Sequence, residues 1–97
     1  MTLDFHVHST ASDGTCAPTE LVERAAHGGF AAIALTDHDN VDGVAEFLSA
    51  GARLGVRTVA GIELSIEPGA GFDRFHLLGL GIDPSNAALR AFLRKVL

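Results

Sequence analysis

The chain has 97 residues, a formal net charge of −5 and a hydrophobic fraction of 47%. This length suits one small domain or part of a larger one, and the hydrophobic fraction is high for a small self-contained domain, which has much surface relative to its volume. The acidic balance argues against a nucleic-acid binder that relies on a basic face. A phosphorylated substrate stays possible, because bound cations would supply positive charge locally.

The single Cys16 excludes an intrachain disulfide and fits a reducing compartment. No apolar segment is long enough to span a bilayer, and the N-terminus lacks a basic region followed by an apolar core. The expectation is therefore a cytoplasmic protein with no membrane partner.

Strands and helices alternate along the first half of the chain. Residues 2–7 are predicted to form a short strand, and Pro18 opens a helix that Gly28 ends. The apolar run FAAIAL over residues 30–35 is typical of a strand that is buried on both faces. Residues 41–54 follow as a second helix, with Gly55 as its stop.

The second half continues with predicted strands over residues 56–64 and 75–80, separated by a turn-rich stretch over 67–71. Asp83 and Pro84 are expected to cap a last helix over residues 84–97. This alternation predicts an α/β fold with a mainly parallel sheet.

Side chains that can bind metals follow the ends of the predicted strands. His6 and His8 close the first strand and, by alternation, lie on the same face. The ends of parallel strands converge on one edge, where active sites are built. The other candidates at this edge are Asp37, His38 and Asp39 after the second strand, Glu63 near the end of the third, and His76 at the start of the fourth or within it. Imidazole and carboxylate ligands suit Zn, Mn and Fe, so the pattern predicts a metal site.

Each of these features also has a purely structural interpretation. The two strand histidines could be packing residues, Asp13 followed by Gly14 is a common turn pair, and Asp37 or Asp39 could cap the second helix. Glu63 is harder to explain in this way, because a carboxylate among apolar residues needs a partner or a cation. The joint placement of these residues at strand ends favours the metal site.

Two further residues are assigned no role in the site. His27 falls in the last turn of the first helix, where an imidazolium favours the negative end of the helix dipole. Cys16 has no partner thiol and is expected to be inert.

Four segments, DFHVHSTASDGT, ALTDHDNVDG, AGIELS and FHLLGLGID, resemble in order and spacing the opening motifs of the PHP (polymerase and histidinol phosphatase) family. The resemblance is strongest to its small stand-alone bacterial phosphoesterases, which act on nucleotides and on the ends of short nucleic acids. It implies a distorted TIM-like barrel of about seven βα units, with up to three Mn, Fe or Zn ions at the strand ends.

The resemblance also implies a role for each candidate residue. His6 and His8 would hold one metal together with Glu63, which would bridge to a second metal that His76 also binds. Asp13 and His38 would bind the third metal. Asp37 and Asp39 would orient His38 without binding a metal themselves.

Members of the family carry further histidine and aspartate ligands in their second half. We therefore expect residues 1–97 to be the N-terminal part of the barrel, about its first half, with open apolar edges. The chain would be a fragment or a half that joins another part, inactive alone, with the missing half as its partner. The helix over 84–97 leading into an inserted domain is a hypothesis.

The expected activity of the whole protein is hydrolysis of a phosphate ester by a metal-activated hydroxide, with Glu63 catalytic as the metal-bridging carboxylate. An amidohydrolase also begins with two histidines on its first barrel strand, but that family commonly uses a modified lysine, and the only lysine here is Lys95 in the last helix. A non-catalytic metal-binding or interaction module is the third interpretation.

Overall fold

The computed structural model describes residues 2–66, Gly71 and 75–96, so the predicted turn over 67–71 lies, apart from Gly71, outside the described residues. Its elements alternate along the chain in the order β1 (Leu3–Val7), α1 (Pro18–His27), β2 (Ala32–Leu35), α2 (Val44–Leu54), β3 (Arg57–Ile66), β4 (Phe75–Leu80) and α3 (Ala87–Val96). The four strands form one sheet in the order β1-β2-β3-β4. β1, β2 and β3 run parallel, and β4 is antiparallel to β3. The predicted α/β fold with a mainly parallel sheet is confirmed.

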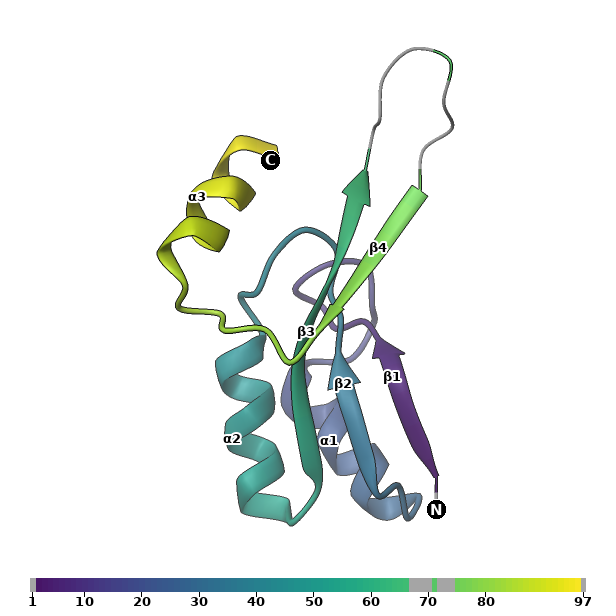
Figure 1. The fold of residues 1–97 in the computed structure, drawn as a ribbon. Helices are drawn as coiled ribbons and strands as arrows, with labels where there is room; N and C mark the ends of the chain where they lie inside the picture. Colours follow the sequence, from purple (N-terminus) through teal and green to yellow (C-terminus); the bar gives the residue numbers. More distant parts are fainter. Residues whose placement is uncertain (1, 67–70, 72–74, 97) are drawn as a thin grey trace.

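Strand β3 changes its pairing partner along its length. Its first residues, as far as Ala60, pair with β2, and its residues from Gly61 onward pair with β4. In Figure 1 the β3–β4 ribbon therefore extends beyond the parallel strands, while α1 and α2 lie side by side against the parallel part of the sheet and α3 stands apart from them.

The core lies between α1, α2 and the parallel strands. All four residues of β2 are buried, as the run FAAIAL predicts, and Phe47 is the largest fully buried side chain. Helix α2 buries Val44, Phe47, Ala50 and Gly51. Gly51 is required here, because a Cβ atom at this position would lie 2.5 Å from the side chain of Thr58 on β3.

Two helix starts differ from the prediction. Helix α2 begins at Val44 rather than at residue 41, because the Asn40 side chain accepts the Asp42 N–H at 3.0 Å and holds a turn there. Helix α3 begins at Ala87, and its cap is Asn86, whose side-chain oxygen accepts the Leu89 N–H at 2.9 Å. The predicted cap, Asp83, instead accepts hydrogen bonds from Ser85 in the preceding turn.

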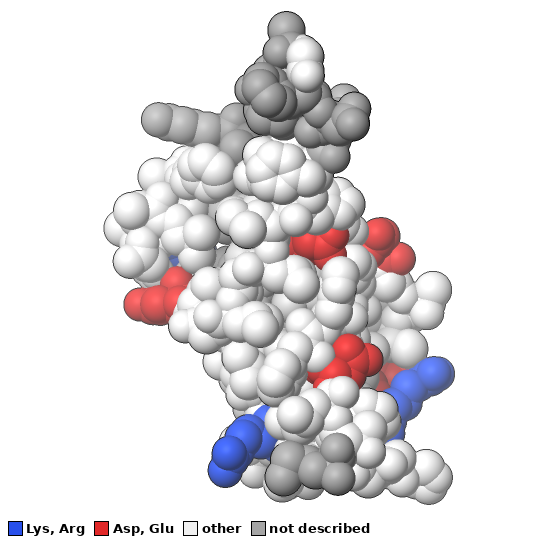
Figure 2. Space-filling view, turned by 45° about the vertical axis from the view of Figure 1, so that its right-hand side comes forward, with Lys and Arg blue, Asp and Glu red and all other residues white. Residues whose placement is uncertain are grey.

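The described residues leave much apolar surface on the outer strands. On β4, Phe75, Leu77 and Leu80 are each about half exposed, and on β1 Leu3 and Phe5 are also exposed. In Figure 2, where the right-hand side of Figure 1 is turned forward, most of the visible surface is uncharged and the charged side chains are scattered. The open apolar edges agree with the prediction. Among the described residues, no helix has the length and apolar character needed to cross a membrane.

Candidate metal centre

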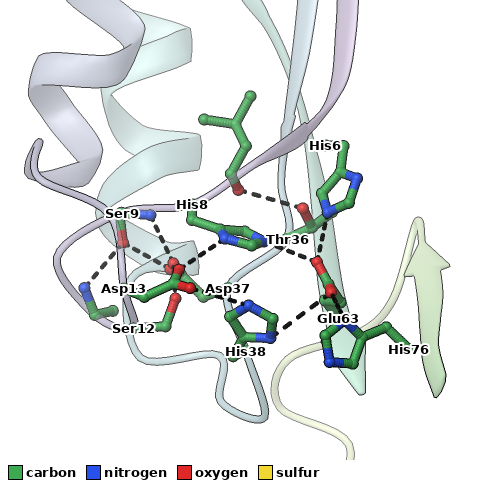
Figure 3. A network of polar contacts seen from close by, with 12 residues as sticks. His6, His8, Ser9, Ser12, Asp13, Thr36, Asp37, His38, Glu63 and His76 are labelled. Atoms are coloured by element: carbon green, nitrogen blue, oxygen red, sulfur yellow. Dashed lines mark hydrogen bonds and ion pairs between the residues drawn. The ribbon is translucent and has the colours of Figure 1, made fainter. Parts of the chain in front are cut away.

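The carboxylate of Glu63 is the centre of a cluster of imidazoles at the end of the parallel strands. Glu63 is only 3% exposed, although its side chain is an ionisable carboxyl group. Its Oε1 lies 2.5 Å from His6 Nε2 and 2.8 Å from His8 Nε2. Its Oε2 lies 2.5 Å from His76 Nδ1 and 3.7 Å from His38 Nδ1. Figure 3 shows the carboxylate between these rings, with each oxygen facing a different pair of histidines.

His6 lies on β1 and His8 follows directly after the end of that strand at Val7, and both reach the same oxygen of Glu63 as the alternation predicts. An irregularity in the β1–β2 register between Asp4 and Val7 accompanies this placement. The His6 N–H is bound to the Asp4 carboxylate at 3.1 Å. Such bulges commonly re-aim a side chain beside a functional site.

His38 reaches the cluster because the chain after β2 continues in an extended path beside β3. The Glu63 N–H donates to the Asp37 carbonyl, and the Asp39 N–H donates to the Glu63 carbonyl, both at 3.0 Å. These bonds form a parallel bridge between His38 and Glu63. His38 is thereby held next to Glu63 by the backbone.

His76 joins the cluster because β4 runs antiparallel to β3. Its position near the start of β4 pairs with Ser65, close to the carboxyl end of β3. The prediction left open whether His76 opens its strand or lies within it. It is the second residue of β4, and the antiparallel direction brings it to the same edge as the other candidates.

Asp13, on the loop after β1, completes the cluster from the solvent side. Its side chain is 62% exposed, and its Oδ1 lies 2.7 Å from His8 Nδ1. Its Oδ2 lies 3.2 Å from His38 Nε2. Asp13 therefore spans two of the histidines rather than forming an isolated turn.

The six predicted ligands can be arranged as three overlapping groups whose donor atoms lie within 4.8 Å of one another. The groups are His6, His8 and Glu63; His8, Asp13 and His38; and His38, Glu63 and His76. Convergent imidazole and carboxylate donors fit Zn, Mn or Fe. Because members are shared between groups, a set of several metals would need further ligands from elsewhere.

The charge state of Glu63 suits a metal ligand. Burial raises the pKa of its carboxyl, but hydrogen bonds to His6 and His8 and the charge of His38 together outweigh burial and lower the pKa below its usual value. The group is therefore a carboxylate at neutral pH, which is the form that binds a cation.

Asp37 and Asp39 have contacts that differ from the predicted orientation of His38. The Asp37 carboxylate accepts hydrogen bonds from Ser9 and Ser12 on the loop that carries Asp13. The Asp39 carboxylate accepts the Ser65 N–H of β3 at 2.8 Å, and Asp39 has a positive φ of 56°. Asp37 thus binds the loop after β1, and Asp39 binds β3, while His38 lies between the two aspartates in the chain.

Ser9 and Ser12 were not singled out from the sequence. Their signal is weak, since serine is common in turns, and it becomes visible only when the buried Asp37 carboxylate is found to need donors. His27 is exposed in the last turn of α1, and Cys16 is a free, buried thiol; neither belongs to the three ligand groups.

A comparison with known protein families identifies the family to which these motifs belong. The model of the PHP domain matches residues 4–90. The chain belongs to the PHP family. Among curated proteins, a 3',5'-nucleoside bisphosphate phosphatase of Chromobacterium violaceum is 45% identical over 94 residues, which make up 97% of this chain and 32% of that protein.

Solved structures of similar proteins have the same fold over nearly the whole chain. An amidohydrolase of Chromobacterium violaceum, with bound sulfate and no metal, matches with a TM-score of 0.91 and 44% identity over 99% of this chain and 33% of its own. A protein of Bifidobacterium adolescentis described as a metal-dependent phosphoesterase matches with a TM-score of 0.89 and 30% identity over 98% of this chain and 32% of its own. The chain spans about one third of the length of these relatives.

Proposed function

We propose that the whole protein is a metal-dependent phosphoesterase and that this chain supplies one side of its metal centre. The observation that carries the proposal is the buried Glu63 carboxylate, whose two oxygens face different histidine groups. A carboxylate in this position can join two cations and set the distance between them. The name of the Chromobacterium violaceum phosphatase supports the same class of reaction.

The proposed ligands follow from the three groups. His6, His8 and Glu63 would hold one cation, and Glu63 with His76 a second, to which His38 also lies close. Asp13 and His38 would hold a third. We propose up to three divalent ions of Mn, Fe or Zn, the metals that this donor set suits.

Bound cations would supply positive charge for the phosphoryl oxygens and would lower the pKa of a bound water. When they bind a metal the imidazoles are neutral, so Glu63 and Asp13 would be the only charged groups among the proposed ligands of this chain. These two carboxylates compensate only part of the charge of the cations, and we propose that an anionic substrate is favoured for this reason. A phosphate ester fits this site better than a neutral amide.

The proposed substrates are phosphate esters of nucleotides or the phosphorylated ends of short nucleic acids. The nucleoside bisphosphate named for the Chromobacterium violaceum relative supports the first of these. The remaining metal ligands and the proton donor would come from the rest of the barrel, which would also cover the exposed β4 side chains Phe75, Leu77 and Leu80. The free Cys16 supports a reducing cytoplasm as the place of the reaction.

A metal-dependent amidohydrolase is the second candidate, because one structural relative carries that description. The two classes are separated by an assay of the full-length protein, stripped of metal and then reloaded with Mn, Fe or Zn. The substrates are nucleoside bisphosphates, mononucleotides, 5'-phosphorylated oligonucleotides and a panel of amides and lactones.

We expect release of inorganic phosphate that requires added metal, with no hydrolysis of the amides. Turnover of the amides alone would favour the amidohydrolase. A protein that holds its metals and hydrolyses none of these compounds would contradict the phosphoesterase proposal and would favour a non-catalytic metal-binding module.

A further inference from the structure

Asp37 is the most deeply buried carboxylate beside the metal centre, at 1% exposure, and it is not one of the proposed ligands. Its Oδ1 accepts the Ser9 N–H at 2.6 Å and the Ser12 hydroxyl at 2.7 Å. Its Oδ2 accepts the Ser9 hydroxyl at 2.6 Å. All three donors belong to the loop between β1 and α1, as Figure 3 shows.

The same loop carries Asp13, and its backbone is fixed on both sides of that residue. The Ser9 carbonyl accepts the N–H of Ser12 at 3.1 Å and the N–H of Gly14 at 2.9 Å. Gly14 lies so close to the His8 carbonyl that a Cβ atom would collide with it. Asp13 therefore stands between two residues that are both tied to Ser9, and Ser9 is tied to Asp37.

This anchoring explains how an exposed carboxylate is held in one place. A side chain that is 62% exposed, on a loop, would normally sample several rotamers in water, yet Asp13 spans His8 and His38 at 2.7 and 3.2 Å. The bonds from Asp37 to the loop remove the backbone freedom that would let Asp13 leave this position. Asp37 also directly precedes His38 in the chain. It therefore links the segment that carries His38 to the loop that carries Asp13.

We propose that Asp37 is a positioning residue for the ligand group of His8, Asp13 and His38. It acts on the loop through Ser9 and Ser12 and so holds Asp13 at binding distance from His38. The inference rests on the metal centre proposed above, and it replaces the sequence-based expectation that Asp37 orients the His38 ring. A residue that served the fold alone would influence all three ligand groups equally.

The test is a calorimetric titration of the full-length, metal-free protein with Mn²⁺. Asp13→Ala identifies the binding step that depends on this group, because that step should be lost in the variant. In Asp37→Asn we expect the affinity of the same step to fall about 10- to 100-fold, as for other residues that support a ligand, with the other steps unchanged. Asp42→Asn changes an exposed aspartate in the turn before α2, outside the three ligand groups; it is the matched control and should leave every step unchanged.

A double variant separates positioning from a general effect on the fold. If Asp37 acts through Asp13, the titration of Asp37→Asn combined with Asp13→Ala should equal that of Asp13→Ala alone. Additive losses, or equal weakening of all steps, would overturn the proposal. Ser12→Ala removes one of the three donors and leaves the ligands and Asp37 in place, so it provides the same comparison if Asp37→Asn does not fold.

The failure of the metal centre itself would look different. In that case Glu63→Gln and Asp13→Ala would bind Mn²⁺ as the unaltered protein does. Loss of binding in those two variants, with an unchanged Asp37→Asn and an unchanged Ser12→Ala, would reject only the role of Asp37.

Discussion

The parallel part of the molecule and the β3–β4 ribbon are built in different ways. β2 is buried along its whole length between its neighbours and the helices, whereas five of the six residues of β4 are exposed. The parallel part and its loops position His6, His8, Asp13 and His38, and the β3–β4 ribbon contributes Glu63 and His76. Glu63 lies on β3 beyond the point where that strand leaves β2 and joins β4.

This difference shows how a site can combine a rigid side and a more open side. Side chains on packed strands are held by their neighbours, and their position depends little on the rest of the protein. A ligand on an exposed strand depends on the pairing of that strand alone, in this case on the register of β3 with β4. Substitutions in the two regions test whether they contribute to the protein in these separate ways.

The largest effect is expected for Glu63→Gln, at the junction of the two regions. The amide cannot replace a carboxylate that joins two cations, so binding should weaken in both groups that contain Glu63. We expect a loss of about 4 kcal/mol of transition-state stabilisation, which is about a thousandfold in the rate of phosphate release.

Metal content and phosphatase activity of the full-length protein measure this effect. Glu23→Gln, on the exposed side of α1, is the matched control and should change neither quantity. Full activity together with full metal content in Glu63→Gln would remove Glu63 from the centre of the site.

A core substitution tests the packing of the parallel part. Phe47 is fully buried in α2, and Phe47→Ala should lower the free energy of unfolding by about 4 kcal/mol because it leaves a cavity. Phe92 of α3 is 44% exposed, and Phe92→Ala should cost less than about 1 kcal/mol. Urea unfolding of both variants gives the comparison, and equal costs would mean that α3 is as well covered as α2.

His76→Asn tests the contribution of the ribbon to the metal centre. His76 shares one ligand group with His38 and Glu63. Because His76 is a direct ligand in the proposed site, its removal should lower the affinity of this group for its cation by at least about 100-fold. The step that belongs to His6 and His8 should persist, because β1 pairs with β2 and the position of these two histidines does not depend on the pairing of β4. A Mn²⁺ titration measures this effect, and His27→Asn, which changes a histidine outside the three groups, is the control. Loss of every binding step in His76→Asn would contradict the idea that the two regions contribute separately to metal binding.

Much of the fold was predictable because burial and chain reversal leave local signals. The run FAAIAL predicted β2, although the strand begins at Ala32, since the Phe30 N–H is bound to the carbonyl of Ala25 at the end of α1. The inward face of α2 is harder to predict from the sequence: Phe47 and Ala50 are buried, whereas Ala45 and Ala52, which are also apolar, are exposed. The choice of face depends on how the helix is rotated against the sheet, and alanine-rich helices carry little pattern that fixes it.

The candidate ligands were predictable because they are histidines and carboxylates placed after apolar runs. All six converge in the structure, and the antiparallel direction of β4 explains how His76 reaches the same edge. The contacts of Asp37 were not predictable, because they join residues 25 and 28 positions apart through two serine hydroxyls and one backbone N–H. Only the three-dimensional path of the loop reveals such a bond.

The smallest effect concerns a contact inside the parallel part that is remote from the metal centre. Helix α1 has no side-chain cap of its own, and Glu46 of α2 accepts the Thr19 N–H at 2.9 Å and the Thr19 hydroxyl at 2.8 Å. The backbone bond first and the hydroxyl bond second lower the pKa of Glu46 below its ordinary value of 4.5. A lowered pKa in the folded state means that this contact stabilises the protein above that pH and that its contribution is lost as the pH falls through the lowered value.

Glu46→Gln should therefore reduce the stability at neutral pH by about 0.5–1 kcal/mol, in the range of a helix cap, and its deficit should shrink as the pH falls below the ordinary value of 4.5. Thr19→Val removes only the hydroxyl and should give a smaller loss with the same dependence on pH. Urea unfolding at several pH values measures both variants. A deficit that stays constant in acid would show that Glu46 acts by packing rather than by its charge, and the two helices of the parallel part would then be joined only by their apolar faces.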